Sequence, residues 1–186
     1  MMARFFRPRL GVSAAAAVLG AAVVLAGCAD DSRTLNCPGV AILADAAIRP
    51  VLKAAAAATD PSAVLYTVQA TDIETSCKLD RRRGQTDSNV SLTFRATRPP
   101  NGQPAHYVVP YFLAINQGER VISKRMFNVA IDFTPGASSV TVQTAINDTV
   151  LNLDNGRLPM EYQFLVGMQL SADEQLYLKT VGPYAP

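Results

Sequence analysis

The side chains with the widest chemical repertoire in this sequence are three cysteines, Cys28, Cys37 and Cys77, and a single histidine, His106. A cysteine thiol can be acylated, can join a second thiol in a disulfide, or can bind a metal as a thiolate. Cys37 and Cys77 are not spaced as a Cys-x-x-Cys redox motif, and only one imidazole is available to complete a metal site. The spacing therefore argues against a redox motif or a metal site and favours a disulfide as the use of Cys37 and Cys77.

Cys28 follows a segment with the composition of an export signal. Residues 1–11 contain Arg4, Arg7 and Arg9 but no acidic residue, and residues 12–25 form an apolar run. A positive region followed by a short apolar region is typical of a secretory signal peptide. The run is about 14 residues long, short of the ~20 that a membrane-spanning helix needs. The pattern predicts a cleaved signal peptide over residues 1–27.

The four residues Leu25-Ala26-Gly27-Cys28 resemble the lipobox of bacterial lipoprotein signal peptides. This resemblance implies cleavage before Cys28 and attachment of a diacylglycerol to its thiol. Two or three acyl chains would hold the mature protein on a membrane effectively permanently. An ordinary secretory signal and an uncleaved anchor are the alternatives.

The residue after Cys28 bears on which membrane is used. In lipoprotein sorting, an Asp at that position favours retention in the inner membrane, and here the position is Ala29, with Asp30 and Asp31 behind it. The resemblance therefore implies the periplasmic face of the outer membrane, with the inner membrane as the alternative.

Length and charge limit what the mature chain can be. Without residues 1–27, the 186-residue chain is long enough for one domain with a core but too short for two. Its remaining basic residues nearly balance its 15 acidic residues, so nothing favours a nucleic-acid partner. Exported thiols meet an oxidising compartment, which predicts a Cys37–Cys77 disulfide worth about 4 kcal/mol on the chain-entropy model. A redox or metal pair is the alternative.

The pattern along residues 37–186 is mainly that of β-strands, after a short polar tether at residues 28–36. Val90, Leu92, Phe94 and Ala96 alternate with polar residues, as in a strand with one buried face. Similar patterns predict strands near residues 40–43, 64–69, 73–79, 107–115, 121–133, 140–142 and 162–170. With turn residues between them, these segments predict an antiparallel immunoglobulin-like β-sandwich of about seven or eight strands.

Several local predictions accompany this fold. A change in alternation predicts a bulge near residues 70–72. Residues 44–62, interrupted by Pro50, are expected to form only a helical turn or ordered loop. Ile146 and Val150 allow a single helical turn, although Asn147 and Asp148 weaken it, and residues 176–178 allow either a last strand or a C-terminal helical turn.

Short segments spread over the domain resemble those of a family of uncharacterised bacterial lipoproteins. They are Cys37-Pro38-Gly39, Ser76-Cys77, Pro110-Tyr111-Phe112, Lys124-Arg125-Met126-Phe127 and the segment from Phe164 to Leu170. The resemblance implies a single lipobox-bearing domain and supports the disulfide. It implies no catalytic residue.

His106, Asp72 and Glu74 are the remaining candidates for acid–base or metal chemistry. His106 stands without a recognisable nucleophile motif and is expected on the surface. Asp72 and Glu74 could share a cation or act as a carboxylate pair, although an exposed strand face predicts the same pattern. No ligand spacing indicates a metal, and no cofactor is expected.

The one cluster of cations consists of Lys78, Arg81, Arg82 and Arg83. These side chains could contact an anionic partner, such as lipopolysaccharide, peptidoglycan carboxylates or a protein, or they could form a solvated turn.

Two further features concern the buried face. Arg125 falls on the inward row of residues 121–133, where a guanidinium would need a partner unless the strand bulges. Tyr107, Tyr111 and Tyr162 are expected in the core, although outward-facing tyrosines would offer a sugar-binding surface.

Together these features predict a non-enzymatic envelope lipoprotein whose domain is a structural or protein-interaction module. The alternatives are a carbohydrate- or glycolipid-binding module and a hydrolase.

Overall fold

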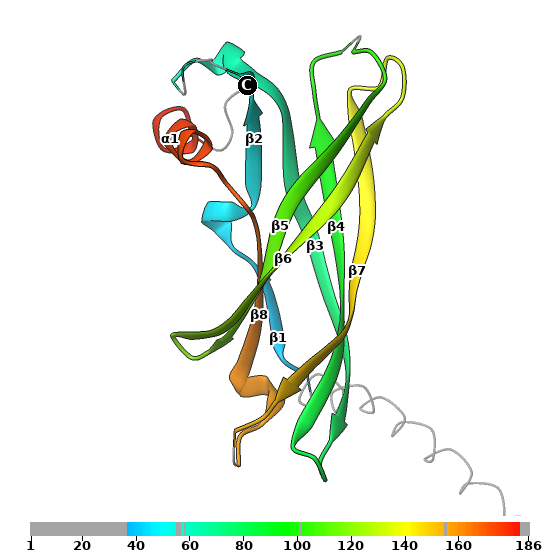
Figure 1. Cartoon of the computed structure of the whole chain (residues 1–186), viewed down its shortest axis with the longest axis vertical. Helices are drawn as coiled ribbons and strands as arrows, with labels where there is room; N and C mark the ends of the chain where they lie inside the picture. Colours follow the sequence, from blue (N-terminus) through cyan, green and yellow to red (C-terminus); the bar gives the residue numbers. More distant parts are fainter. Residues whose placement is uncertain (1–36, 55–56, 58, 101, 155, 183–186) are drawn as a thin grey trace, which may run out of the picture. The chain divides into compact units, whose positions relative to one another are not determined.

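The computed structural model describes residues 37–54, 57, 59–100, 102–154 and 156–182. Strands β1 (Gly39–Ile42), β8 (Tyr162–Met168), β5 (Ala105–Gln117) and β6 (Arg120–Phe133) form one four-stranded sheet, in that order, called sheet A here (Figure 1). Strands β2 (Ile48–Leu52), β3 (Val64–Asp80), β4 (Gln85–Thr97) and β7 (Ser139–Asn152) form the second, sheet B. Short 3₁₀ turns occupy η2 (Ala44–Ala46), η3 (Pro61–Ala63) and η4 (Pro159–Glu161). The predicted two-sheet, mainly β fold is confirmed; its immunoglobulin-like character stays a prediction.

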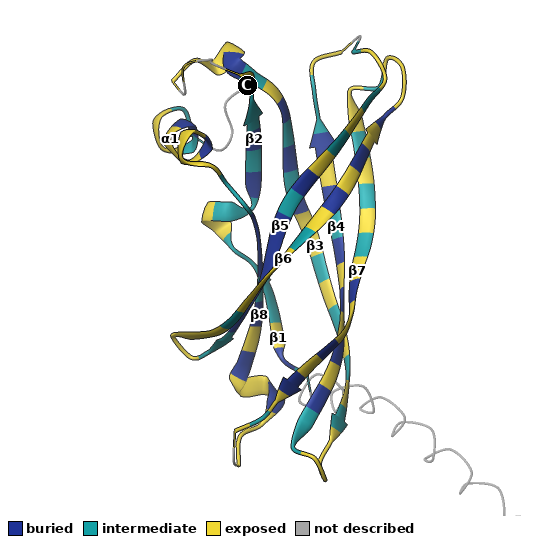
Figure 2. Ribbon diagram, viewed as in Figure 1, coloured by how far each residue is buried: buried dark blue, intermediate teal, exposed yellow. Residues whose placement is uncertain are grey.

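The core lies between the two sheets and is built from the alternation read in the sequence. Buried residues of β3, β4 and β7 from sheet B join buried residues of β5, β6 and β8 from sheet A in one apolar cluster. Val90 and Phe94 are fully buried, whereas Ser91 and Arg95, the residues that follow them, are exposed. The strands alternate in burial along their length in the same way (Figure 2). Alternation of this kind is expected for strands with one face in the core.

One strand pair departs from the predicted antiparallel arrangement. β1 pairs with β8 in parallel, with Val40 opposite Phe164, whereas the other strand pairs are antiparallel. The chain leaves β1 in sheet A, passes through η2 and enters β2 at the edge of sheet B. The first two strands therefore belong to different sheets.

The predicted disulfide is present and joins the two sheets. Cys37 precedes β1 of sheet A, Cys77 lies in β3 of sheet B, and their Cα atoms are 5.6 Å apart. The predicted bulge in β3 is also confirmed, because the β3–β4 register shifts between Ala70 and Asp72.

Residues 44–62 contain a strand that the sequence prediction missed. Pro50 lies in β2, an edge strand, where the missing backbone N–H of proline leaves no gap in the sheet's interior. The prediction of a turn or loop alone was therefore wrong for residues 48–52, although η2 and η3 flank them.

Two other segments have a secondary structure that differs from the local turns predicted for them. β7 runs without a break through Ile146 and Val150, and the positive φ of 53° at Asp148 stands beside a register shift rather than a helical turn. Residues 172–180 form helix α1 (Ala172–Thr180), longer than the predicted turn. Among the described residues, no helix combines the length and the apolar composition needed to cross a bilayer.

Candidate functional site

The residues predicted to direct export and lipid attachment lie outside the described residues. Cys28, the signal peptide at residues 1–27 and the tether at residues 28–36 all precede Cys37, where the described chain begins. Lipid attachment stays a prediction from the sequence.

The predicted cation cluster lies at the turn between β3 and β4. Lys78 is an exposed residue near the end of β3, and Arg81, Arg82 and Arg83 are exposed residues of the turn itself. Lys78 stands opposite Asp87 in the strand register, and Asp80 accepts hydrogen bonds from the backbone N–H groups of Arg82 and Arg83. The cluster is thus a solvent-exposed arginine turn.

The candidate acid and base residues lie on open surfaces. His106 Nδ1 lies 2.6 Å from an Asp132 carboxylate oxygen, but their side chains are 61% and 73% exposed, which places the pair outside any cleft. Asp72 and Glu74 face solvent on sheet B and line an open hollow of about 490 Å³ whose other lining residues are mostly uncharged polar ones. No cluster of metal-binding side chains occurs among the described residues.

The predicted core tyrosines are inside the sandwich. Tyr111 and Tyr162 are buried, and the half-buried ring of Tyr107 stacks on Tyr66 at 4.1 Å between ring centroids. Burial raises the pKa of the Tyr66 and Tyr111 hydroxyls. The described tyrosines therefore offer no exposed aromatic surface on which a sugar could stack.

Arg125 lies on the predicted row but is not buried. It pairs with the core residue Leu113 across β5 and β6, yet it is exposed, with its guanidinium carbon 5.3 Å from the centroid of the Phe127 ring. Val121, predicted to face inward, is 58% exposed. Residues 120–126 of β6 are exposed or half-buried although the facing β5 residues Leu113 and Ile115 are buried, so the Arg125 guanidinium needs no buried partner.

The outer surfaces of the two sheets differ in chemistry. Cross-strand rows of sheet B consist largely of polar side chains, as in Gln69-Arg95-Thr141 and Asp72-Thr93-Gln143. Two rows of sheet A are largely apolar, Gly167-Phe112-Met126 and Leu165-Ala114-Lys124, whereas its outward pairs His106-Asp132 and Pro110-Asn128 carry polar groups. We call the outer-surface residues Val108, Phe112, Ala114, Val121, Met126 and Leu165 the A face. Val108 is 58% exposed and Met126 is 50% exposed, although they are apolar.

A groove of about 510 Å³ adjoins the A face between η2, α1 and β6. Phe112, Met168 and Leu178 supply apolar lining, and Lys124 and Lys179 supply ammonium groups. The Lys124 Nζ lies 4.0 Å from the centroid of the Phe112 ring, an arrangement that places a cation over an aromatic surface. Asp45, Gln169 and Gln175 also line the groove, so it adjoins the A face as a mixed apolar and polar hollow in which two ammonium groups outnumber one carboxylate.

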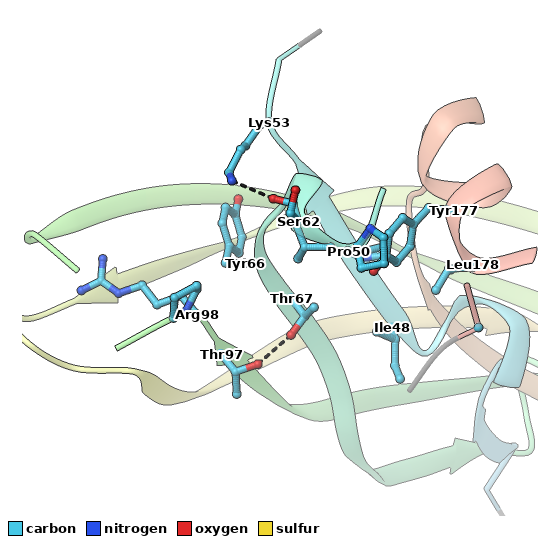
Figure 3. Close-up of a pocket in the computed structure, with 14 residues that line it drawn as sticks. Ile48, Pro50, Lys53, Ser62, Tyr66, Thr67, Thr97, Arg98, Tyr177 and Leu178 are labelled. Carbon is cyan, nitrogen blue, oxygen red and sulfur yellow. Dashed lines mark hydrogen bonds between the residues drawn. The ribbon is translucent and has the colours of Figure 1, made fainter. Parts of the chain in front are cut away.

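A second hollow, of about 430 Å³, lies between α1, β2 and the ends of β3 and β4 (Figure 3). Its polar groups serve the fold: Lys53 Nζ donates to the Ser62 carbonyl, and Thr67 and Thr97 share a hydrogen bond of 2.6 Å. The Arg98 guanidinium donates to four backbone carbonyls and covers the Phe133 ring. Because these polar groups already bond to other groups of the protein, we place the candidate site on the A face instead.

Sequence reasoning missed the A face, although a signal for it exists. Residues 107–115 are an almost uninterrupted apolar run, and such runs are typical of strands covered on both sides. The alternation predicted a place in the core for the inward row, from Tyr107 to Ile115, and no role for the outward row.

A comparison with protein-family models, with curated proteins and with solved structures finds no match to this chain.

Proposed function

We propose that the mature chain is an outer-membrane lipoprotein, anchored through Cys28 on the periplasmic side, whose β-sandwich binds an envelope protein through the A face. The lipobox-like segment at residues 25–28 supports the anchor. The observation that carries the binding role is the contrast between the apolar rows near the middle of sheet A, which hold Phe112, Met126 and Leu165, and the polar rows of sheet B.

Exposed apolar side chains next to one another are characteristic of surfaces that bind a partner. Met126 lies opposite the buried ring of Phe112 on this surface. Val108 lies two outward rows away, beyond Pro110 and Asn128, and Val121 lies on the other side of the Lys124 row. Lys124 and Lys179 stand at the border of the A face, so the matching partner surface would be apolar with carboxylates at its rim.

The edge of sheet A adds a second means of contact. β6 is the last strand of its sheet and pairs with β5 on one side, and a long edge strand can accept a further strand from a partner. Arg120, Lys124 and Arg125 on this strand would discourage uncontrolled edge-to-edge pairing and would favour an acidic partner segment.

The carbohydrate-binding alternative would need exposed aromatic rings, and the described tyrosines are buried or half-buried. A hydrolase would need a nucleophile held beside a base in a cleft, and His106 lies on an open surface with Asp132. These observations support a binding module over both alternatives.

Site-specific photocrosslinking in growing cells tests this proposal. A photoreactive residue would replace Met126 or Val108 on the A face, and Gln143 or Thr93 on the outer surface of sheet B would serve as matched controls. We expect a discrete crosslinked protein from the A-face positions and none from the controls. Equal crosslinking from both sheets would refute a role specific to the A face.

A further inference from the structure

The turn that connects β3 to β4 has a surplus of positive charge. Arg81, Arg82 and Arg83 follow one another, and the neighbouring acid Asp80 uses one carboxylate oxygen to accept backbone N–H groups at 3.0 and 3.1 Å. Arg83 Nε lies 3.7 Å from the other oxygen, but its side chain stays 77% exposed. Within the described part of the chain, Arg81 and Arg82 have no ion-pair partner.

The shape of this turn is fixed by the fold rather than left to the arginines. Besides the two bonds to Asp80, Gly84 adopts a φ of 62°, which favours glycine, and its carbonyl accepts a hydrogen bond of 2.8 Å from the N–H of Leu153. The backbone that carries the three arginines therefore has a defined conformation at the end of the β3–β4 hairpin.

The disulfide places this turn at the end of the domain where the tether arrives. Cys37 is bonded to Cys77, and Asp80 at the base of the turn follows Cys77 by three positions of the strand, or roughly 10 Å. Figure 1 shows the turn between β3 and β4 at the same end of the domain as the start of β1. The disulfide keeps the start of β1 close to the turn between β3 and β4.

The tether is short. Residues 28–36 can span at most about 30 Å even when fully extended. A lipid on Cys28 would therefore keep Cys37 within about 30 Å of the lipid headgroups, so the arginine turn beside it can reach the surface of the same leaflet.

We propose that the turn of Arg81, Arg82 and Arg83 binds the anionic phospholipid surface of the membrane that carries the lipid on Cys28. This inference rests on the anchor in the proposed function. The turn orients the domain with the β3–β4 end toward the membrane.

The expected strength follows from general electrostatics. Each basic residue near an anionic membrane surface strengthens binding about fivefold, so three arginines together contribute about 100-fold. The attraction is screened over about 10 Å at 0.1 M salt, so it falls as salt is raised.

Vesicle sedimentation tests the inference on the mature chain, residues 28–186, carrying Cys28→Ser so that acyl chains do not mask a weaker contact. Vesicles of phosphatidylcholine with and without phosphatidylglycerol are compared. We expect salt-sensitive binding to the anionic vesicles only, reduced about 100-fold by Arg81→Gln, Arg82→Gln and Arg83→Gln together. The control variant combines Arg95→Gln, Arg125→Gln and Lys179→Gln, which removes the same charge from exposed positions elsewhere and should weaken binding far less.

Equal loss in both triple variants, or equal binding to neutral vesicles, would overturn the inference. The far-ultraviolet circular dichroism of each variant shows whether the fold is intact. Failure of the anchor is detected separately, because an unmodified Cys28 in the wild-type protein refutes the anchor, whereas an acylated Cys28 without anionic-vesicle binding refutes the arginine contact alone.

Discussion

Arg49 Nε lies 2.9 and 3.1 Å from the two carboxylate oxygens of Glu174, and this ion pair joins strand β2 to helix α1. The two side chains are 17% and 6% exposed. The same carboxylate accepts the backbone N–H of Ser171, whose Oγ accepts the N–H of Glu174 in return. One buried carboxylate therefore starts the helix and attaches it to sheet B.

Glu174→Ala should lower the free energy of unfolding by about 3 kcal/mol, because it leaves the Arg49 guanidinium poorly solvated and removes half of the capping box. Urea unfolding of the purified protein measures this change. Asp173→Ala is the matched control, since it removes an exposed acid from the same helical turn and should cost less than about 1 kcal/mol. Equal losses in the two variants would contradict the importance of the ion pair.

Replacing Cys37 and Cys77 together by alanine should lower the free energy of unfolding by about 2 to 4 kcal/mol, because the cross-link closes a long loop and joins the two sheets. Chemical denaturation with and without a reductant measures it. The reductant should destabilise the wild-type protein and leave the double variant unchanged. A wild-type protein that is insensitive to reductant after complete reduction of its thiols would refute the stabilising role.

Gly167→Ala should destabilise the protein by about 1 to 3 kcal/mol, because an added methyl group would lie 2.7 Å from the Phe112 ring and 2.8 Å from Ala46. Thermal unfolding provides the measurement. Gly39→Ala is the control, since its added methyl group meets its nearest neighbour at 3.9 Å. A harmless Gly167→Ala would mean that Phe112 and η2 can move apart freely.

Stability should fall at alkaline pH because of Tyr66 and Tyr111. Burial raises the pKa of both hydroxyls, so the folded state favours the neutral phenol. The associated stability is complete below the ordinary tyrosine pKa of about 10 and is lost as pH rises through the raised folded-state pKa. The double variant Tyr66→Phe and Tyr111→Phe should lose less stability between about pH 9 and pH 11 in urea unfolding. An identical decline in both proteins would contradict this assignment.

The strands with one buried face were the most predictable part of the molecule, since their alternation is local. The residues of β4 and β5 assigned to the core by period-two alternation are buried or half-buried in the structure. Strand β2 was not predictable in this way, because Pro50 argues against a strand unless its edge position is known, and that position depends on the distant strand β3.

The candidate surface was less predictable than the core. Arg125 and Val121 continue the alternation of β6 yet are exposed, and the β5–β6 register shifts near Val121, which the local pattern of β6 does not reveal. The Arg49–Glu174 pair joins residues 125 positions apart. By contrast, the pairing of Cys37 with Cys77 followed from counting thiols and from the compartment that the leader implies.

The central claim of this account is that Cys28 carries lipid and holds the domain at a membrane. Mass spectrometry of the amino-terminal peptide from the membrane fraction tests it most directly. We predict a chain that begins at Cys28 with acyl groups on that residue, and a soluble, unmodified product after Cys28→Ser in a chain that starts at the same position. An unmodified Cys28 in the wild-type protein, or a precursor that retains residues 1–27 in the cytosol, would contradict the account.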